Sequence, residues 1–216
     1  MKFKAVIFDM DGLMVDSEPI HQQAFDQVFQ KYGKRFTKED NIELYLGKTD
    51  MDCATDMVNR YQLPITAREL FNQKQAITRQ LLSEISPRPG LMDLLNNLKR
   101  AGMKMAIASS SELVTIKIIV NALDVNDFFD ALFSAEHVKN SKPAPDVYLL
   151  AAKEIGVDPD DCLILEDSPI GVQSAVSAGM KVYAIPGEET KNGDFTRATK
   201  RLNNLSEVFE ELKEQV

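Results

Sequence analysis

Cysteine and positive charge are both scarce in this sequence of 216 residues. Its two cysteines, Cys53 and Cys162, stand far apart and lack the close spacing of metal ligands, which excludes a cysteine-based metal site and fits a reducing compartment. The 25 lysines and arginines are outnumbered by 33 aspartates and glutamates, so the net charge is −8. Binding of nucleic acid or of an anionic membrane is therefore not expected as its main task.

Long hydrophobic runs are also lacking. No segment is apolar over the length needed to span a membrane, and the apolar stretch at residues 3–8 is too short for a signal peptide. We therefore expect a cytoplasmic protein. A monomer is also the expected state. Internal repeats and low-complexity tracts are absent as well, and the hydrophobic fraction of 44% is ordinary for a soluble globular protein.

Short apolar runs of the kind that form buried strands recur along the chain. They are residues 3–8, 104–108, 131–133, 163–165 and 182–185. Patterns with helical spacing accompany the later runs, at residues 90–101, 112–123, 146–155 and 171–178. Strands that alternate with helices in this way favour a parallel sheet with helices on both faces. The predicted fold class is therefore α/β, with a Rossmann-like parallel sheet.

One long segment interrupts this alternation. From about residue 17 to residue 86 the sequence shows helical spacing and no convincing strand, with patterns at residues 50–61 and 67–85. An insertion of this length exceeds a single crossover helix. The turn-forming sequence SPRPG then leads back to the sheet. We predict an α/β catalytic core domain at residues 1–16 and 87–216, and an inserted all-helical cap domain at residues 17–86.

Polar residues follow the predicted strands at their carboxyl ends, where chemistry collects in an open parallel sheet. They are Asp9, Asp11, Ser109, Ser110, Ser111, Lys142, Glu166, Asp167 and Ser168. Taken singly, each has a plainer interpretation, because serines and acids also cap helices and a lysine in a turn is usually solvated. Together on one rim, the carboxylates would repel one another unless a hard cation such as Mg²⁺ lay among them. Lys142 and backbone N–H groups would then bind a phosphate dianion.

Asp9 and Asp11 lie two residues apart at the end of the first predicted strand. Alternation along a strand puts both on the same side, with Met10 turned away. One carboxylate is thereby placed to attack a phosphorus atom while the other moves a proton. Gly12 allows the backbone to turn sharply just after them.

Four motifs, taken in order, resemble those of the haloacid dehalogenase superfamily. They are DMDGLMVD, Ser109 after an apolar strand, Lys142 in SKPAPD, and Glu166-Asp167 in LEDSPIG. The resemblance covers nearly the whole chain. The helical insertion directly after the first motif, together with His21, resembles the branch that contains β-phosphoglucomutase and related sugar-phosphate phosphatases. The dehalogenases lack the second aspartate of the first motif, so Asp11 points to phosphoryl transfer.

This resemblance implies a role for each motif residue. Asp9 is the expected nucleophile, which forms an aspartyl-phosphate, and Asp11 is the expected general acid and base. The Asp9 carboxylate, the Asp11 backbone carbonyl and Asp167 are the expected ligands of Mg²⁺. Glu166 is expected to help, directly or through water. The residues expected to bind the transferring phosphoryl group are Ser109, Ser110 and Lys142.

The cap is expected to select the substrate, a small phosphorylated metabolite. The candidate substrate-binding residues in the cap are His21, Lys48 and Lys74. The resemblance to the mutase implies an arginine two or three residues after Gly47, which grips the phosphate that is not transferred, but Thr49 and Asp50 stand there. An acid at this place would repel a second phosphate. The sequence therefore favours a Mg²⁺-dependent phosphatase of small phosphorylated carbohydrates, with a β-phosphoglucomutase-type mutase as the alternative.

Receiver domains of signalling systems offer a different class of function. They too combine aspartate, Mg²⁺, a hydroxyl and a lysine on an α/β sheet, and they accept phosphate in order to switch partners. They are shorter, lack a large cap and carry their phosphoacceptor on a later strand. A catalytically idle binding module is a further alternative. Turnover of an aryl phosphate with Mg²⁺ separates an enzyme from both.

Overall fold

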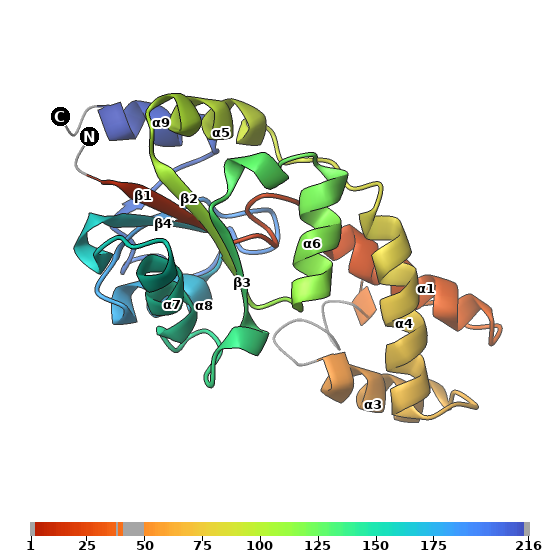
Figure 1. Cartoon of the computed structure of the whole chain (residues 1–216). Coiled ribbons are helices and arrows are strands. Elements are labelled where there is room, and N and C mark those ends of the chain that lie inside the picture. The colour runs from red at the N-terminus through yellow and green to blue at the C-terminus, as the bar shows by residue number, and fades with distance from the viewer. Residues whose placement is uncertain (1–2, 38, 41–49, 214–216) are drawn as a thin grey trace. The chain divides into compact units, whose positions relative to one another are not determined.

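The computed structural model describes residues 3–37, 39–40 and 50–213 (Figure 1). The chain divides into two compact units, one formed by Met1–Asp16 and Ser86–Val216 and the other by Ser17–Ile85. They are named here the sheet unit and the helical unit. None of the described helices combines the length and the apolar character needed to cross a membrane.

Six described strands, all paired in parallel, form the sheet. In chain order they are β1 (Ala5–Phe8), β2 (Lys104–Ser109), β3 (Ala131–Ser134), β4 (Cys162–Glu166), β5 (Lys181–Ala184) and β6 (Lys200–Arg201). Their order across the sheet is β3-β2-β1-β4-β5-β6, so the first strand of the chain lies near the centre. The predicted Rossmann-like α/β class is confirmed. The short strand β6 was not predicted, because Lys200 and Arg201 are exposed and form no apolar run.

Helices cover both faces of this sheet (Figure 1). They are α5 (Leu91–Arg100), α6 (Leu113–Ala122), α7 (Asp146–Glu154), α8 (Pro169–Ser177) and α9 (Ser206–Lys213). Residues of α7 and α8 share an apolar core with Ala5 and Ile7 of β1, while α5 and α9 lie side by side on the other face. The alternate residues Val6 and Phe8 are buried outside that core, as the alternation of a strand requires. Burial of both faces explains why β1 is apolar throughout.

Every regular element described in the helical unit is a helix. The long ones are α1 (Glu18–Gln30), α3 (Asp50–Tyr61) and α4 (Ala67–Leu82). They enclose an apolar core of their own, which includes Phe29 of α1, Met57 of α3 and Leu70 of α4. A capping box begins α4, because Thr66 Oγ1 accepts from the Glu69 N–H and the Glu69 carboxylate accepts from the Thr66 N–H.

The register of the three central strands sets the place where polar residues gather. Phe8, the last residue of β1, pairs with Ile107 of β2 and with Leu165 of β4. The Asp9 N–H still donates to the Leu165 carbonyl at 3.0 Å, so the first acid leaves the sheet beside the end of β4. Residues that follow β1, β2 and β4 therefore share one edge of the sheet.

Candidate active site

A cavity of about 280 Å³ lies at this edge of the sheet unit. The residues that line it are Asp9, Asp11, Ser109, Ser110, Lys142, Glu166, Asp167, Ser168 and Ile170. They come from the ends of β1, β2 and β4, from the loop before α7 and from the start of α8. The structure therefore brings the candidate site residues of the sheet unit around one cavity, together with Ser168, which the sequence also placed after the fourth predicted strand, and with Ile170, which it did not.

Lys142 joins two of the carboxylates. Its Nζ lies 2.7 Å from Asp9 Oδ1 and 2.8 Å from Glu166 Oε1. The exposed fraction of the side chain is 4% for Lys142, 10% for Asp9 and 1% for Glu166, so these charges are almost removed from water. Buried charges persist where they are paired and hydrogen-bonded. The lysine is thus a fixed part of the cavity and not a solvated turn residue.

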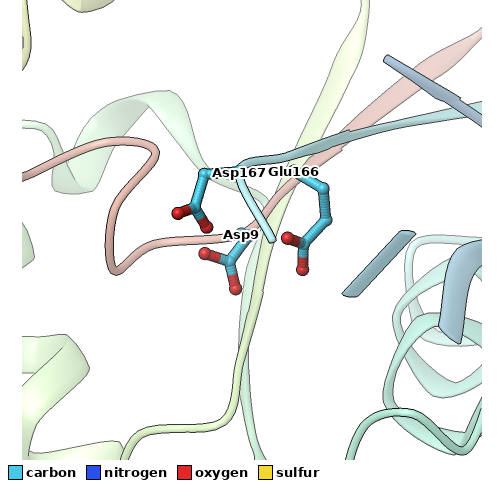
Figure 2. A group of neighbouring side chains, drawn as sticks. All are labelled: Asp9, Glu166 and Asp167. Carbon is cyan, nitrogen blue, oxygen red and sulfur yellow. The ribbon is translucent and has the colours of Figure 1, made fainter. Parts of the chain in front are cut away.

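Asp167 completes a group of three carboxylates with Asp9 and Glu166 (Figure 2). One oxygen of each lies within 4.8 Å of the others. Burial raises the pKa of Asp9 well above its usual value, against the opposing attraction of Lys142. Burial, with the charge of Glu166, raises the pKa of Asp167 to about 7. Both shifts mean that the surrounding charges do not fully compensate these two acids.

Glu166 differs from its two neighbours in its electrostatics. Burial acts to raise its pKa, but attraction to Lys142 and hydrogen bonds outweigh burial, and the pKa is lowered. Oε1 accepts from Lys142 Nζ and from the Tyr148 hydroxyl at 2.8 Å each, and Oε2 accepts from the N–H and the hydroxyl of Ser168 at 3.0 Å each. Glu166 is therefore ionised, and it holds Lys142 in place.

The three carboxylates fit a hard divalent cation. They offer only oxygen ligands, which such a cation prefers. The surroundings of Asp9 and Asp167 disfavour their ionised forms, and a cation between them would lower both pKa values. The close approach of these residues also depends on Gly12, because a Cβ there would lie 2.2 Å from Asp167 Oδ2, and its φ of 81° favours glycine as well.

A family model described as haloacid dehalogenase-like hydrolase matches residues 6–185 of the chain. The chain belongs to this family. The predicted family is confirmed, and the match runs from β1 to the residue after β5, through every strand end that lines the cavity. The interpretation as a receiver domain is set aside, because this hydrolase carries its acids directly after the first strand.

Similar proteins act on several phosphorylated compounds, according to their names. Fructose-1-phosphate phosphatase YqaB of Escherichia coli is 33% identical over 180 residues, which cover 83% of this chain and 94% of that protein. The bifunctional riboflavin kinase/FMN phosphatase of Arabidopsis thaliana is 29% identical over 94% of this chain, and the chain spans only 54% of that longer protein. A crystal structure from Thermotoga maritima, provisionally described as a β-phosphoglucomutase, resembles this chain with a TM-score of 0.88. The two sequences are 27% identical, and the match covers 99% of this chain and 100% of that one.

The serines at the end of β2 and just after it do not cap the next helix of this hydrolase. The hydrogen bond at the start of α6 comes instead from Glu136, because its carboxylate accepts from the Leu113 N–H at 2.8 Å. Ser109 Oγ accepts from the Ser111 N–H at 3.0 Å, which leaves its own proton for another acceptor. Ser111 Oγ donates to Asp11 Oδ2 at 2.7 Å. These hydroxyl groups are therefore directed at the cavity and its acid.

Two residues that support Glu166 were not recognised as site residues from the sequence. Tyr148 of α7 is fully buried, and the Lys142 Nζ lies 4.6 Å from the centroid of its ring, while its hydroxyl bonds to Glu166. Gly171 of α8 leaves room for the same carboxylate, since a Cβ there would lie 1.6 Å from Glu166 Oε1. No pattern distinguishes Tyr148 from an ordinary core aromatic, and Gly171 is the first residue of the predicted helix at 171–178, where a glycine is not a signal of close packing.

Arg88 was also missed, although it stands in the turn sequence SPRPG. Its guanidinium donates to the Gly12 carbonyl and, at 3.4 Å, to the Ile185 carbonyl. The side chain thus ties the loop after β1 to the end of β5. The sequence carries no signal for this contact, because an arginine in a turn is ordinarily an exposed residue.

The residues predicted to bind substrate from the cap belong to the helical unit or lie outside the described residues. His21 is half-buried in α1. Lys74 of α4 is fully buried, with its Nζ 5.3 Å from the centroid of the Phe25 ring. Lys48 lies outside the described residues. A role in substrate binding for these three residues stays a prediction.

Proposed function

We propose that this hydrolase is a Mg²⁺-dependent phosphatase that acts on small phosphorylated carbohydrates through an aspartyl-phosphate on Asp9. The class of the enzyme is phosphoric monoester hydrolase. The observation that carries the proposal is the 2.7 Å contact of the buried Lys142 with Asp9, in a cavity that Asp11 also lines. A fixed positive charge beside a carboxylate nucleophile offsets the repulsion between that nucleophile and a phosphate dianion.

Asp9 and Asp11 divide the two steps of the reaction between them. In the first step the Asp9 carboxylate attacks phosphorus, the bond from phosphorus to the ester oxygen breaks, and this oxygen takes the proton of Asp11. The sugar leaves as an alcohol, and Asp9 carries the phosphoryl group. In the second step a water molecule attacks phosphorus and gives a proton to Asp11. The bond to Asp9 breaks, inorganic phosphate leaves, and both aspartates return to their starting states.

The proposed ligands of Mg²⁺ are the carboxylates of Asp9 and Asp167 and the backbone carbonyl of Asp11. When bound, Mg²⁺ stabilises the negative charge of the phosphoryl oxygens during transfer. Glu166 has both oxygens engaged by Lys142 and other donors, so its proposed contribution is to hold the lysine or to act through a water molecule. Ser109, Ser110 and Lys142 are proposed to orient the phosphoryl oxygens.

Removal of the metal, or of one of its ligands, should abolish hydrolysis. Excess chelator is expected to stop phosphate release by the wild type, and Mg²⁺ should restore it. Asp167→Ala is expected to raise the Mg²⁺ concentration for half-maximal activity by at least about 100-fold. Asp160→Ala, which removes an exposed acid on the same unit, is the control. Full activity in chelator would reject the metal role. In a separate assay, Ca²⁺ should bind without supporting turnover, because its looser coordination misplaces the nucleophile.

The helical unit is proposed to be the cap that selects the substrate. The chain leaves the sheet unit and returns to it at two places. On the sheet-unit side these places are tied together, since Val15 and Pro87 form an antiparallel bridge and the Arg88 N–H donates to the Met14 carbonyl at 2.8 Å. Two joined crossings are suited to act as one hinge. The enzyme is further proposed to work in the cytoplasm as a monomer on a small metabolite.

The relatives support a phosphorylated carbohydrate as substrate, but they differ in reaction. The phosphatase of fructose 1-phosphate needs to hold one phosphate, whereas a mutase must hold a bisphosphate at both ends. The place where a mutase is expected to have an arginine is held by Thr49 or by Asp50, the first residue of α3. This acid favours the phosphatase, and a screen of phosphorylated metabolites with free phosphate as the readout would identify the substrate.

A single product analysis separates phosphatase from mutase. With β-glucose 1-phosphate and a trace of the 1,6-bisphosphate, we expect mainly glucose and inorganic phosphate, because a phosphoenzyme without a cationic grip on the distal phosphate is open to water. Glucose 6-phosphate should not accumulate as the main product. Interconversion of the two monophosphates much faster than phosphate release would make the enzyme a mutase, and Lys48 and Lys74 would then be the first residues to replace.

A further inference from the structure

Ser111 lies two residues beyond Ser109, and the proposed mechanism gives it no task. Its Oγ donates to Asp11 Oδ2 at 2.7 Å, the length of a strong bond from a hydroxyl to a carboxylate. Ser109 Oγ lies 3.5 Å from the same oxygen, at the outer limit of hydrogen bonding. The shorter contact identifies Ser111 as the hydroxyl that holds Asp11.

Backbone bonds fix Ser111 on both sides. Its N–H donates to Ser109 Oγ at 3.0 Å, and its carbonyl accepts from Ser134 Oγ at 2.7 Å. Ser109 ends β2 and Ser134 ends β3, and both are buried. Ser111 is therefore anchored to two neighbouring strands, so the sheet itself sets where its hydroxyl lies.

The number of donor protons limits what each of the two serines can do. Each serine hydroxyl has one proton to donate. The site has two acceptors for such protons, namely the Asp11 carboxylate and an oxygen of the phosphoryl group. Because Ser111 donates to Asp11, the proton of Ser109 remains available for the phosphoryl oxygen. A single serine could not serve both acceptors at once.

We infer that Ser111 is a positioning residue that holds Asp11 through its acid and base steps, an inference that rests on the proposed function. In the first step Asp11 gives its proton to the ester oxygen and becomes an anion, to which the Ser111 hydroxyl donates as the ester bond breaks. In the second step the proton of the attacking water moves to Asp11 held in the same place. Esters with poor leaving groups depend most on this proton transfer.

The test compares two esters in a single turnover with Mg²⁺. The first is 4-nitrophenyl phosphate, which has a good leaving group, and the second is fructose 1-phosphate, which has a poor one. Ser111→Ala should slow the first turnover of fructose 1-phosphate by about 10- to 100-fold and that of the aryl ester by less than about threefold. Asp11→Asn should shift the ratio in the same direction and further. Ser177→Ala, which alters an exposed serine of α8, should change neither rate.

A matched pair of variants guards against a merely structural effect. Ser111→Thr keeps the hydroxyl. Ser111→Val has the shape of the threonine variant but carries a methyl group in place of that hydroxyl. The threonine variant should retain the rate on fructose 1-phosphate, and the valine variant should lose it. If Ser111→Ala does not fold, the comparison of these two variants serves as the test. Equal losses on both esters, or equal rates for the pair, would overturn the role of Ser111. A wild type inactive on both esters would overturn the proposed function instead.

Discussion

Replacement of Asp9 by asparagine should leave a folded protein with almost no phosphatase activity. The amide has the size of the carboxylate but is not a nucleophile, so Asp9→Asn removes the step that forms the phosphoenzyme. We expect turnover to fall by at least about 10⁴-fold. The fold should persist because Lys142 keeps its contact with Glu166 at 2.8 Å. Phosphate release and thermal unfolding of the same preparation measure both effects.

A direct view of the intermediate separates this role from a general loss of the site. Acid-quenched wild type, mixed with substrate and Mg²⁺, should gain the mass of one phosphoryl group, and Asp9→Asn should not. Asp160→Asn makes the same chemical change at an exposed acid and should behave as the wild type. Near-normal turnover by a folded variant, shown by mass to retain its asparagine, would disprove covalent catalysis through Asp9.

Replacement of Lys142 by methionine should damage both activity and stability. Its ammonium is the buried partner of Asp9 and Glu166, at 2.7 and 2.8 Å. Without it two carboxylates are left buried and unpaired, which we expect to lower the free energy of unfolding by about 3 kcal/mol in the absence of metal. Turnover should fall by at least about 10³-fold, because the phosphoryl group loses its fixed positive charge. Chemical unfolding and phosphate release are the measurements.

The pH dependence of this loss has a definite sign. In Lys142→Met the carboxylates should bind protons in the folded state at a higher pH than in the unfolded state, because burial raises their pKa. Stability supplied by such groups is present at low pH and lost as the pH rises through the folded-state pKa. The deficit relative to the wild type should therefore be larger at about pH 8 than at about pH 5. Added Mg²⁺ should recover part of the stability but not the activity.

Lys153→Met is the matched control, since this lysine of α7 is 79% exposed and its loss should change neither property. A Lys142→Met protein as stable as the wild type in chelator would show that the buried carboxylates are already neutral. That result would contradict the assignment of Lys142 as their charge partner. Normal turnover by Lys142→Met would exclude it from phosphoryl binding.

Most of the sheet could be predicted because its strands are buried on both faces. Such strands are short apolar runs, and β1, β2 and β4 each have this pattern. The strand β6 could not be predicted, since Lys200 and Arg201 pair with β5 through backbone bonds alone and leave no trace in the pattern of side chains.

The cavity residues could be named from the sequence because one rule of topology suffices. The carboxyl ends of parallel strands meet at one edge, whatever the side chains do, so Asp9, Ser109 and Glu166 had to be neighbours. The same rule places Ser111 at this edge, but it does not say which bonds a residue there makes. Ser111 reaches Asp11 across 100 positions of sequence, and whether a given serine makes such a bond depends on a few tenths of an ångström.

By itself the sequence determined the family, the α/β class and the identity of the acids, because all three depend on which residue types follow which strands. Only the tertiary structure decided how those acids are charged. Asp9, Glu166 and Asp167 are all carboxylates at strand ends, yet burial raises the pKa of Asp9 and Asp167, whereas Lys142 and other donors lower that of Glu166. The free energy of a buried charge depends on the exclusion of water and on the distance to its partners. Those quantities exist only once the chain has folded.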